Sequence, residues 1–230
     1  MDSGTLSAAL RYASAGVAVL PTHWPLASGC CSCGCNHPQC WERAKHPLVS
    51  PASATTDHLL IRQWWDRWPA ANVGIAPVGV IIVDLDPQPS APDPLLGFAE
   101  RWGIRLEDAV SCRTGSGGWH FFFERPLASK PGWTGKDRLG SGGDVLAGKG
   151  AYVVAPPSIH HTLGRYAWVG SKMLGEGPLP PLPSLIEREL ERRLPIRWMI
   201  RVAPYSIVAK LGLQVEARQR LRRVLRVPRA

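Results

Sequence analysis

An apolar run at residues 80–83 consists of four β-branched side chains and leads directly to two carboxylates, Asp84 and Asp86. Gly79 and Pro87 bound the segment, and its composition predicts a strand that is buried on both faces. Because successive side chains of a strand point to opposite faces, Asp84 and Asp86 would project to the same side, with Cα atoms about 7 Å apart. The pattern therefore predicts a strand that ends in a pair of acids.

The other hydrophobic patterns predict a mixture of helices and strands, which makes an α+β fold. An Ala-rich segment at 7–15 and a segment at 57–68 with apolar side chains at four-residue intervals predict two helices. We assign the tryptophans of the second helix to a buried face rather than to stacking on bases. A strand that begins at Asp144 and a strand at 151–155 are predicted to form a hairpin. Further helices are predicted near 95–102, 185–193 and 215–227, and further strands near 17–20, 72–76, 109–113 and 119–124.

The composition indicates a folded protein of one or two domains. Of the 230 residues, 45% are hydrophobic and ten are tryptophan, which is ample material for a core. No apolar stretch approaches the roughly 20 residues of a membrane span, and the first residues do not have the pattern of a secretory signal. We therefore expect a cytoplasmic protein without a membrane partner.

Positive charge is concentrated at the C-terminal end. Residues 1–186 carry 15 Lys/Arg against 14 Asp/Glu, whereas residues 187–230 carry 12 against 4, which is +8 of the net +9. A basic segment of this kind favours a polyanionic partner, with nucleic acid ahead of a membrane surface. The simpler alternative is a solubilising helix.

Five of the six cysteines lie within a short segment at residues 29–47, and Cys112 stands apart. This density favours structural zinc over disulfides between distant segments. A redox cluster and reduced, metal-free thiols are the alternative interpretations. The predicted zinc ligands are Cys31, Cys33, Cys40 and His46, with Cys30, Cys35 and His37 as rivals for the same positions.

The acids of the central strand are candidate ligands for a divalent cation. Two carboxylates at this distance disfavour joint ionisation unless a cation lies between them, and Mg²⁺ or Mn²⁺ prefers oxygen ligands. Asp144, at the start of a later strand, would be a third acid. The alternative for Asp84 and Asp86 is the start of a solvated loop, and for Asp144 it is a turn that follows two glycines.

A glycine-rich turn at residues 114–118 separates two predicted strands and provides backbone N–H groups and hydroxyls that can bind phosphate. Ser116 and Gly117 lie in this turn, and His120 follows on an otherwise apolar strand. Arg113 before the turn and Lys149 in the predicted hairpin reversal add positive charge. We consider these residues candidate nucleotide contacts, although a single histidine on a strand is more often structural.

Several motifs occur in a fixed order: V-D-L-D at 83–86, T-G-S-G-G-W-H at 114–120, and G-G-D-V-L-A-G-K-G-A-Y-V-V-A-P-P-S at 142–158. The early Lys-His-Pro and the W-W-x-x-W-P-x-x-N-x-G segment precede them. Together they resemble the N-terminal domain of bifunctional DNA primase/polymerases (prim-pol), a family of the archaeo-eukaryotic primase superfamily. The resemblance extends from about Leu6 to Trp168 and includes the cysteine-rich insertion.

The resemblance implies a role for each motif. Asp84, Asp86 and Asp144 would be the acidic ligands of Mg²⁺ or Mn²⁺, His120 would contact the nucleotide phosphates, and Ser116 would occupy the small polar position beside it. Arg113, Gly117 and Lys149 are additions made from charge and location. The implied fold is an RRM-like primase palm joined to an N-terminal αβ module, here with a small zinc-binding insertion and a basic, helical C-terminal tail.

The expected domains are a prim-pol catalytic domain at 1–169 with the insertion at 29–47, a Gly/Pro-rich linker at 170–184 and a basic tail at 185–230. The expected activity is template-directed nucleotidyl transfer by two-metal catalysis, as DNA polymerase and primase, in plasmid or mobile-element replication. Substrates would be NTPs or dNTPs with a single-stranded DNA template and primer. No Walker-type loop is present, so a separate helicase would unwind DNA. A DNA-binding initiator module and a metal-dependent nuclease are the alternatives.

Overall fold

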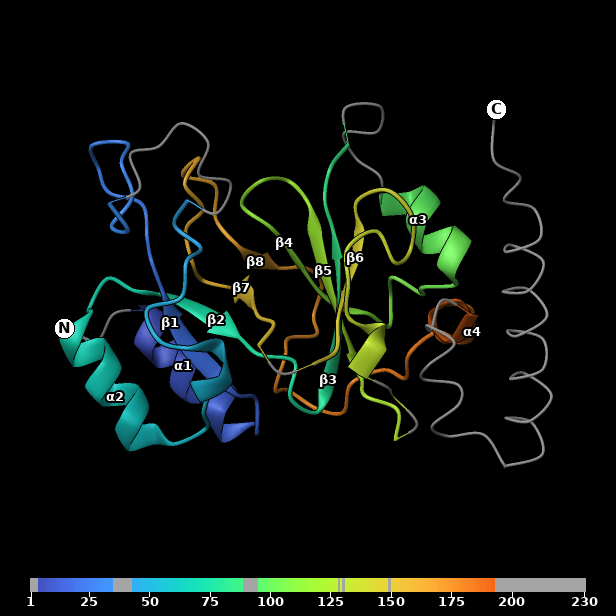
Figure 1. Ribbon diagram of the computed structural model, residues 1–230, viewed down its shortest axis with the longest axis horizontal. Coiled ribbons are helices and arrows are strands. Elements are labelled where there is room, and N and C mark those ends of the chain that lie inside the picture. The colour runs from blue at the N-terminus through green and yellow to red at the C-terminus, as the bar shows by residue number, and fades with distance from the viewer. Residues whose placement is uncertain are drawn as a thin grey trace, which may run out of the picture. The chain divides into compact units, whose positions relative to one another are not determined.

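The computed structural model describes residues 4–34, 43–88, 95–127, 129, 131–148 and 150–192. Four α-helices and eight strands occur within these ranges, and Figure 1 labels them. The helices are α1 (Gly4–Ser14), α2 (His58–Arg67), α3 (Leu95–Trp102) and α4 (Ser184–Arg192). The strands are β1 (Val19–Thr22), β2 (Asn72–Ile75), β3 (Val80–Leu85), β4 (Val110–Arg113), β5 (Trp119–Glu124), β6 (Gly143–Leu146), β7 (Val153–Ala155) and β8 (Ala167–Trp168).

The strands form two antiparallel sheets, which confirms the mixed α+β prediction. One sheet has the order β1-β2-β7, and the other has the order β6-β3-β5-β4-β8. In the larger sheet, β3 lies between β5 and β6, so the strand with the paired acids has neighbours on both sides. Helix α3 follows β3 and leads to β4, two positions away in the sheet, which makes a split β-α-β unit.

The N-terminal module consists of the smaller sheet with α1 and α2. Helix α2 begins where sequence analysis expected, because the Asp57 carboxylate accepts hydrogen bonds from the backbone N–H groups of Leu59 (2.8 Å) and Leu60 (3.3 Å). Helix α1 ends at Gly16, whose φ of +78° is a conformation that glycine adopts without steric cost. Both ends are thus determined by local residues.

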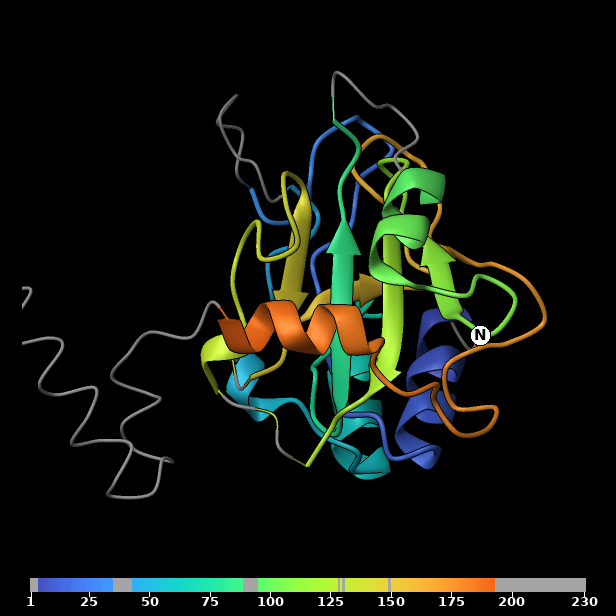
Figure 2. The ribbon, with the colours of Figure 1, turned by 90° about the vertical axis from the view of Figure 1, so that its right-hand side faces the viewer.

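The two faces of the larger sheet are covered by different elements. Ile82, Cys112 and Phe122 point to one face, where they join a buried cluster with α1, α2 and the smaller sheet. Helices α3 and α4 lie over the other face, as Figure 2 shows from that side. Helix α4 contributes two completely buried side chains, Ile186 and Leu190. The larger sheet therefore separates the N-terminal module from the two later helices.

The prediction that residues 140–158 form a hairpin is wrong. Strand β6 pairs with β3 in the larger sheet, whereas β7 pairs with β2 in the smaller one. The residues between β6 and β7 carry the chain from one sheet to the other, as do residues 76–79 between β2 and β3. A glycine-rich reversal favours local pairing, but here the partners of both strands come from an earlier part of the chain.

Segment 170–184, predicted as a linker, packs against the domain. Leu174 and Leu182 are buried, and the backbone N–H of Glu124 donates to the carbonyl of Pro180 over 2.9 Å. Within the described ranges, no helix is long and apolar enough to cross a membrane. Residues 193–230 of the predicted basic tail, and its helix near 215–227, lie outside the described residues.

Candidate active site

Five residues lie directly opposite one another and form a single row across the larger sheet. Asp84 on β3 is paired with Asp144 on β6 and with His120 on β5. Cys112 on β4 is paired with His120 and with Trp168 on β8. Directly opposed residues of antiparallel neighbours place their side chains on the same face of a sheet. The row therefore runs along the face that the N-terminal module partly covers.

A cavity of about 410 Å³ opens over the acidic end of this row. Asp84, Asp86, Asp144 and His120 all line it, so the structure brings together the four residues predicted to be catalytic. Asp86 follows β3, where its backbone N–H donates to the carbonyl of Gly142 over 2.9 Å. The cavity thus collects three carboxylates from two adjacent strands.

Asp84 and His120 form an ion pair at the base of the cavity. His120 Nε2 lies 3.3 Å from Asp84 Oδ1, and the two side chains are only 6% and 26% exposed. Burial alone would lower the pKa of His120, but the Asp84 carboxylate and the buried Cys112 thiol outweigh it and raise that pKa to about 10. Burial alone would raise the pKa of Asp84, but His120 lowers it. The pair is therefore a carboxylate and an imidazolium at neutral pH.

The pKa values of Asp86 and Asp144 are raised, in contrast to that of Asp84. The pKa of Asp86 is raised by burial and by the neighbouring charges of Asp84 and Asp144, against the influence of Lys45. The pKa of Asp144 is also raised by burial and by Asp84, although its carboxylate accepts a hydrogen bond of 2.7 Å from the backbone N–H of Asp137. Burial and mutual repulsion thus oppose the ionisation of these two acids, and a cation between the carboxylates would relieve the repulsion.

Two lysines and two tyrosines that sequence analysis did not select also line the cavity: Lys45, Lys136, Tyr152 and Tyr166. Lys45 lowers the pKa of Asp84 and Asp86. The backbone of Lys45 is held in position, because the Tyr152 hydroxyl donates to the Lys45 carbonyl over 3.0 Å. The Lys-His-Pro motif was the sequence signal for Lys45, whereas Lys136 had none.

The glycine-rich turn at 114–118 lies beside the end of β3. A Cβ atom on Gly118 would come within 2.5 Å of the Leu85 carbonyl, so only glycine allows this approach. The Thr114 hydroxyl holds the turn by accepting from the Gly118 N–H (2.8 Å) and by bonding to the Ser116 hydroxyl (3.0 Å). Ser116 and Gly117 are not among the residues that line the cavity.

Two further basic residues predicted to contact nucleotide are placed differently. The Arg113 guanidinium lies over the Trp119 ring, 4.8 Å from its centroid. Arg113 is paired with Trp119, and Trp119 with Leu85, so it belongs to the sheet face opposite the acids. Lys149 lies outside the described residues. Their contacts with nucleotide therefore stay predictions.

The segment at 158–166 packs against the glycine-rich turn. Thr162 Oγ1 donates to the Gly115 carbonyl over 3.2 Å, and the rings of His160 and His161 lie 4.2 Å apart. Burial and the nearby charge of Lys45 lower the pKa of His160 to about 4, so its ring is neutral at pH 7. This segment supports the turn on the side away from β3.

In the described part of the chain, no three His, Cys, Asp or Glu side chains are arranged to hold a metal ion in common. Of the predicted zinc ligands, Cys31 and Cys33 have their Sγ atoms 2.8 Å apart, and the Ala44 N–H donates to Cys31 Sγ over 2.9 Å. His46 is also described, whereas Cys40 lies outside the described residues, as do the rivals Cys35 and His37. The zinc site stays a prediction.

These features define a class of protein in which an antiparallel sheet presents clustered acids, a histidine and basic groups to one cavity. The chain matches the family described as "Bifunctional DNA primase/polymerase, N-terminal" (Prim-Pol) over residues 9–185, and it belongs to this family. No curated protein matches the chain. Family membership implies nucleotidyl transfer of the primase or polymerase type, with DNA and nucleotides as substrates.

Proposed function

We propose that this protein is a template-directed nucleotidyl transferase that acts as both DNA polymerase and primase. The observation that carries the proposal is the convergence of Asp84, Asp86 and Asp144 on one cavity with His120 and Lys45. The strand order β6-β3-β5-β4, with α3 between β3 and β4, supports an RRM-like palm, because that fold has the same arrangement of four strands and a crossover helix. The acidic cavity and the strand order of the larger sheet thus both support the proposed function.

The chemistry of the donor set fits divalent cations, although Asp84, Asp86 and Asp144 are not arranged in this structure to hold one ion in common. Three carboxylates that line one cavity are the oxygen ligands that Mg²⁺ or Mn²⁺ prefers, and burial together with mutual repulsion raises the pKa of Asp86 and Asp144. We propose that Asp84, Asp86 and Asp144 hold these ions. When bound, such ions activate the attacking 3′-hydroxyl and stabilise charge on the leaving pyrophosphate.

The residues of the cavity have complementary roles in this proposal. Lys45 and Lys136 provide positive charge for the triphosphate of an incoming NTP or dNTP, and the His120 imidazolium provides another donor when a phosphate oxygen competes with Asp84. Tyr152 and Tyr166 form part of the wall. No side-chain nucleophile is needed, because positioning and electrostatics supply most of the rate in phosphoryl-group chemistry.

The partners follow from the activity. We propose that a single-stranded DNA template with its primer reaches the cavity and that a separate helicase unwinds DNA in plasmid or mobile-element replication. The excess positive charge of residues 187–230 would add a salt-dependent contact to DNA. Structural zinc at residues 29–47 would hold that insertion in place, and the N–H donor at Cys31 Sγ is consistent with a thiolate ligand.

The decisive experiment is extension of a labelled primer on a single-stranded template with Mg²⁺ or Mn²⁺. Wild type should extend the primer, and Asp84→Asn/Asp86→Asn should reduce extension at least about 10³-fold, because isosteric amides remove charge without changing shape. Asp66→Asn, an exposed carboxylate of α2, is the matched control and should extend as wild type does.

Two outcomes would contradict the proposal. Shortening of the primer by wild type, lost in the double variant, would identify a metal-dependent nuclease. No extension by metal-replete wild type that still binds DNA would identify an initiator module. Unprimed synthesis on the same template then tests the primase activity separately from the polymerase activity.

A further inference from the structure

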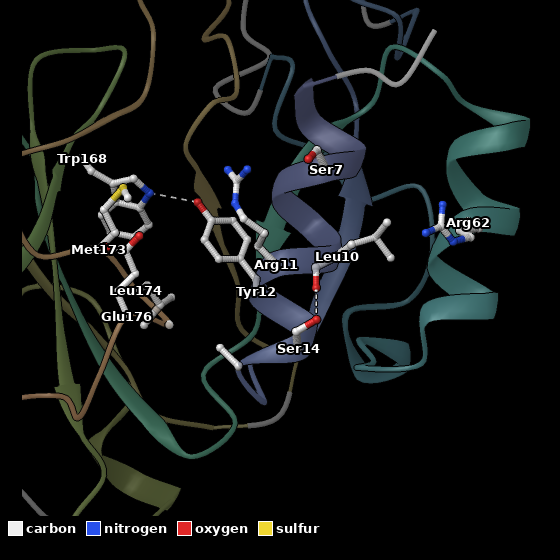
Figure 3. Close-up of a pocket in the computed structure, with 12 residues that line it drawn as sticks. Ser7, Leu10, Arg11, Tyr12, Ser14, Arg62, Trp168, Met173, Leu174 and Glu176 are labelled. Atoms are coloured by element: carbon white, nitrogen blue, oxygen red, sulfur yellow. Dashed lines mark hydrogen bonds between the residues drawn. The ribbon is translucent and has the colours of Figure 1, made fainter.

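A second hollow, of about 560 Å³, lies away from the acids, between α1, α2 and the segment that follows β8. Figure 3 shows the side chains around it. It shares no lining residue with the acidic cavity. Trp168, which lies at its inner edge, is the last member of the row that begins at Asp144. The two hollows thus lie toward opposite ends of one row across the sheet.

One wall of this hollow is aromatic and held rigidly. Trp168 Nε1 donates to the Tyr12 hydroxyl over 3.1 Å (Figure 3), and that hydroxyl donates to the Pro156 carbonyl over 2.6 Å. The two rings pack edge to face, with centroids 6.1 Å apart. Met173, exposed on the facing segment, adds a soft apolar surface. A base could pack against this wall without any rearrangement of it.

The other wall is basic and hydroxylic. Arg11 on α1 and Arg62 on α2 are both exposed, and neither forms an ion pair with a residue that the structure describes. Ser7 also lines the hollow, whereas the Ser14 hydroxyl already donates to the Leu10 carbonyl over 2.9 Å (Figure 3). Glu176 is the one acid among the lining residues. Two guanidinium groups beside a hydroxyl favour phosphate oxygens, which arginine binds with two parallel hydrogen bonds.

We propose that this hollow binds a segment of single-stranded nucleic acid outside the catalytic cavity. Arg11 and Arg62 contact successive phosphates, and a base packs against Trp168 and Met173. Its volume suits a ligand of about one nucleotide, and the hollow is open to solvent. The inference goes beyond the proposed transferase activity, because it concerns binding by residues that do not line the acidic cavity.

Binding of a fluorescent (dT)₂₀ by the full chain, followed by anisotropy in EDTA at several salt concentrations, tests this site without catalysis. Arg11→Ala/Arg62→Ala should weaken binding about tenfold and reduce the slope of log K against log salt by about 1.4, since each phosphate contact of a single strand contributes about 0.7. Both positions are exposed on helices, where alanine is well tolerated, so the variant should fold.

The matched control is Arg101→Ala/Arg105→Ala, which removes two exposed arginines from α3 and the loop after it and should leave affinity and slope nearly unchanged. Equal behaviour of the two double variants would overturn the inference. It would also be overturned if Arg11→Ala/Arg62→Ala lost AMP binding in equilibrium dialysis but kept (dT)₂₀ binding, because the ligand would then be a free nucleotide. This assay contains no divalent cation and does not depend on catalysis, so a failure of the catalytic proposal would be seen separately, in primer extension by wild type.

Discussion

Lys45 connects the acidic cavity with the loops around it. It lines the cavity, it lowers the pKa of Asp84 and Asp86, and its positive charge helps keep His160 neutral. Because the backbone carbonyl of Lys45 accepts a hydrogen bond from Tyr152, the lysine side chain can change its conformation while its backbone stays in place. Lys45 therefore offsets the negative charge of Asp84 and Asp86 in the nucleotide-free protein, and its ammonium group can contact the nucleotide phosphates once a nucleotide binds.

We predict that Lys45→Ala raises the KM for nucleotide about 10- to 100-fold in primer extension, because a charge-assisted hydrogen bond to phosphate contributes about 1.5–3 kcal/mol. Lys172→Ala is the control: Lys172 is half-exposed and pairs with Asp108 over 3.3 Å, away from the cavity. An unchanged KM in Lys45→Ala would assign the triphosphate to other residues.

The ion pair between Asp84 and His120 should make stability depend on pH. The folded pKa of His120 is about 10 against an ordinary 6.5, so its contribution is fully present below pH 6.5 and is lost as pH rises through 10. The pKa of Asp84 is lowered, so its contribution is lost as pH falls through that value, below the ordinary 3.8. The pair is therefore most stabilising from about pH 4 to 6.5.

Accordingly, His120→Gln should destabilise the metal-free protein by about 2 kcal/mol near pH 6, since it leaves a partly buried carboxylate unpaired. The difference from wild type should shrink between pH 6.5 and 10. Urea unfolding in EDTA measures it, with His58→Gln on α2 as a control that should follow wild type at every pH. A difference that stays constant with pH would show that the pair is not ionic.

At the scale of elements, the site depends on two loops that touch through glycines. A Cβ atom on Gly115 would come within 2.5 Å of the Gly164 carbonyl, and one on Gly164 would collide with the backbone of Gly115. Neither glycine has a positive φ, so close approach rather than backbone conformation requires glycine here. The turn at 114–118 thus gets its position from the segment at 158–166.

Gly164→Ala should therefore displace the glycine-rich turn and lower the free energy of unfolding by about 1–3 kcal/mol, as overpacking does. Gly97→Ala on α3 has open space around its Cβ and should instead be neutral or stabilising by up to about 1 kcal/mol. Thermal melts of both variants, together with the KM for nucleotide, measure the effect. A stable Gly164→Ala with normal KM would show that the two loops are independent.

The sequence was sufficient where local residues determine an element. Strand β3 follows from its β-branched run, and α2 follows from its cap at Asp57 and its apolar spacing. The convergence of Asp84, Asp86, Asp144 and His120 was expected from motifs. The pairing of β6 with β3 instead of β7 was not predicted, because it depends on contacts between segments that are distant in the sequence. Lys136 was missed for the same reason, since no local pattern connects it to β3.

On the scale of the whole molecule, the domain extends beyond the region that the primase motifs cover. Residues up to Glu191 form one compact unit, and Ile186 and Leu190 of α4 are completely buried in it. The family match ends at residue 185, just after α4 begins. Helix α4 therefore belongs structurally with the sheet that holds the acids, and with three Glu against two Arg it is not part of the excess positive charge.

Truncation separates these two parts. A chain that ends at residue 192 should keep the wild-type thermal transition, whereas one that ends at residue 183 should lose about 4 kcal/mol or more, because two buried aliphatic side chains are removed. The first truncation should also weaken binding to (dT)₂₀ at low salt, since it removes all of the net +9 charge. Equal melting of the two shortened chains would show that α4 contributes little to the fold.

The row from Asp144 to Trp168 restricts where insertions and deletions can occur in this protein. The members of the row share one face of the sheet only because their strands are in the correct register with one another. One residue inserted into β3 before Asp84 would turn the carboxylates toward α3 and α4 and bring apolar side chains into the cavity. Homologous chains should therefore vary in side chains and loop lengths, while the number of residues within β3 and β5 stays constant.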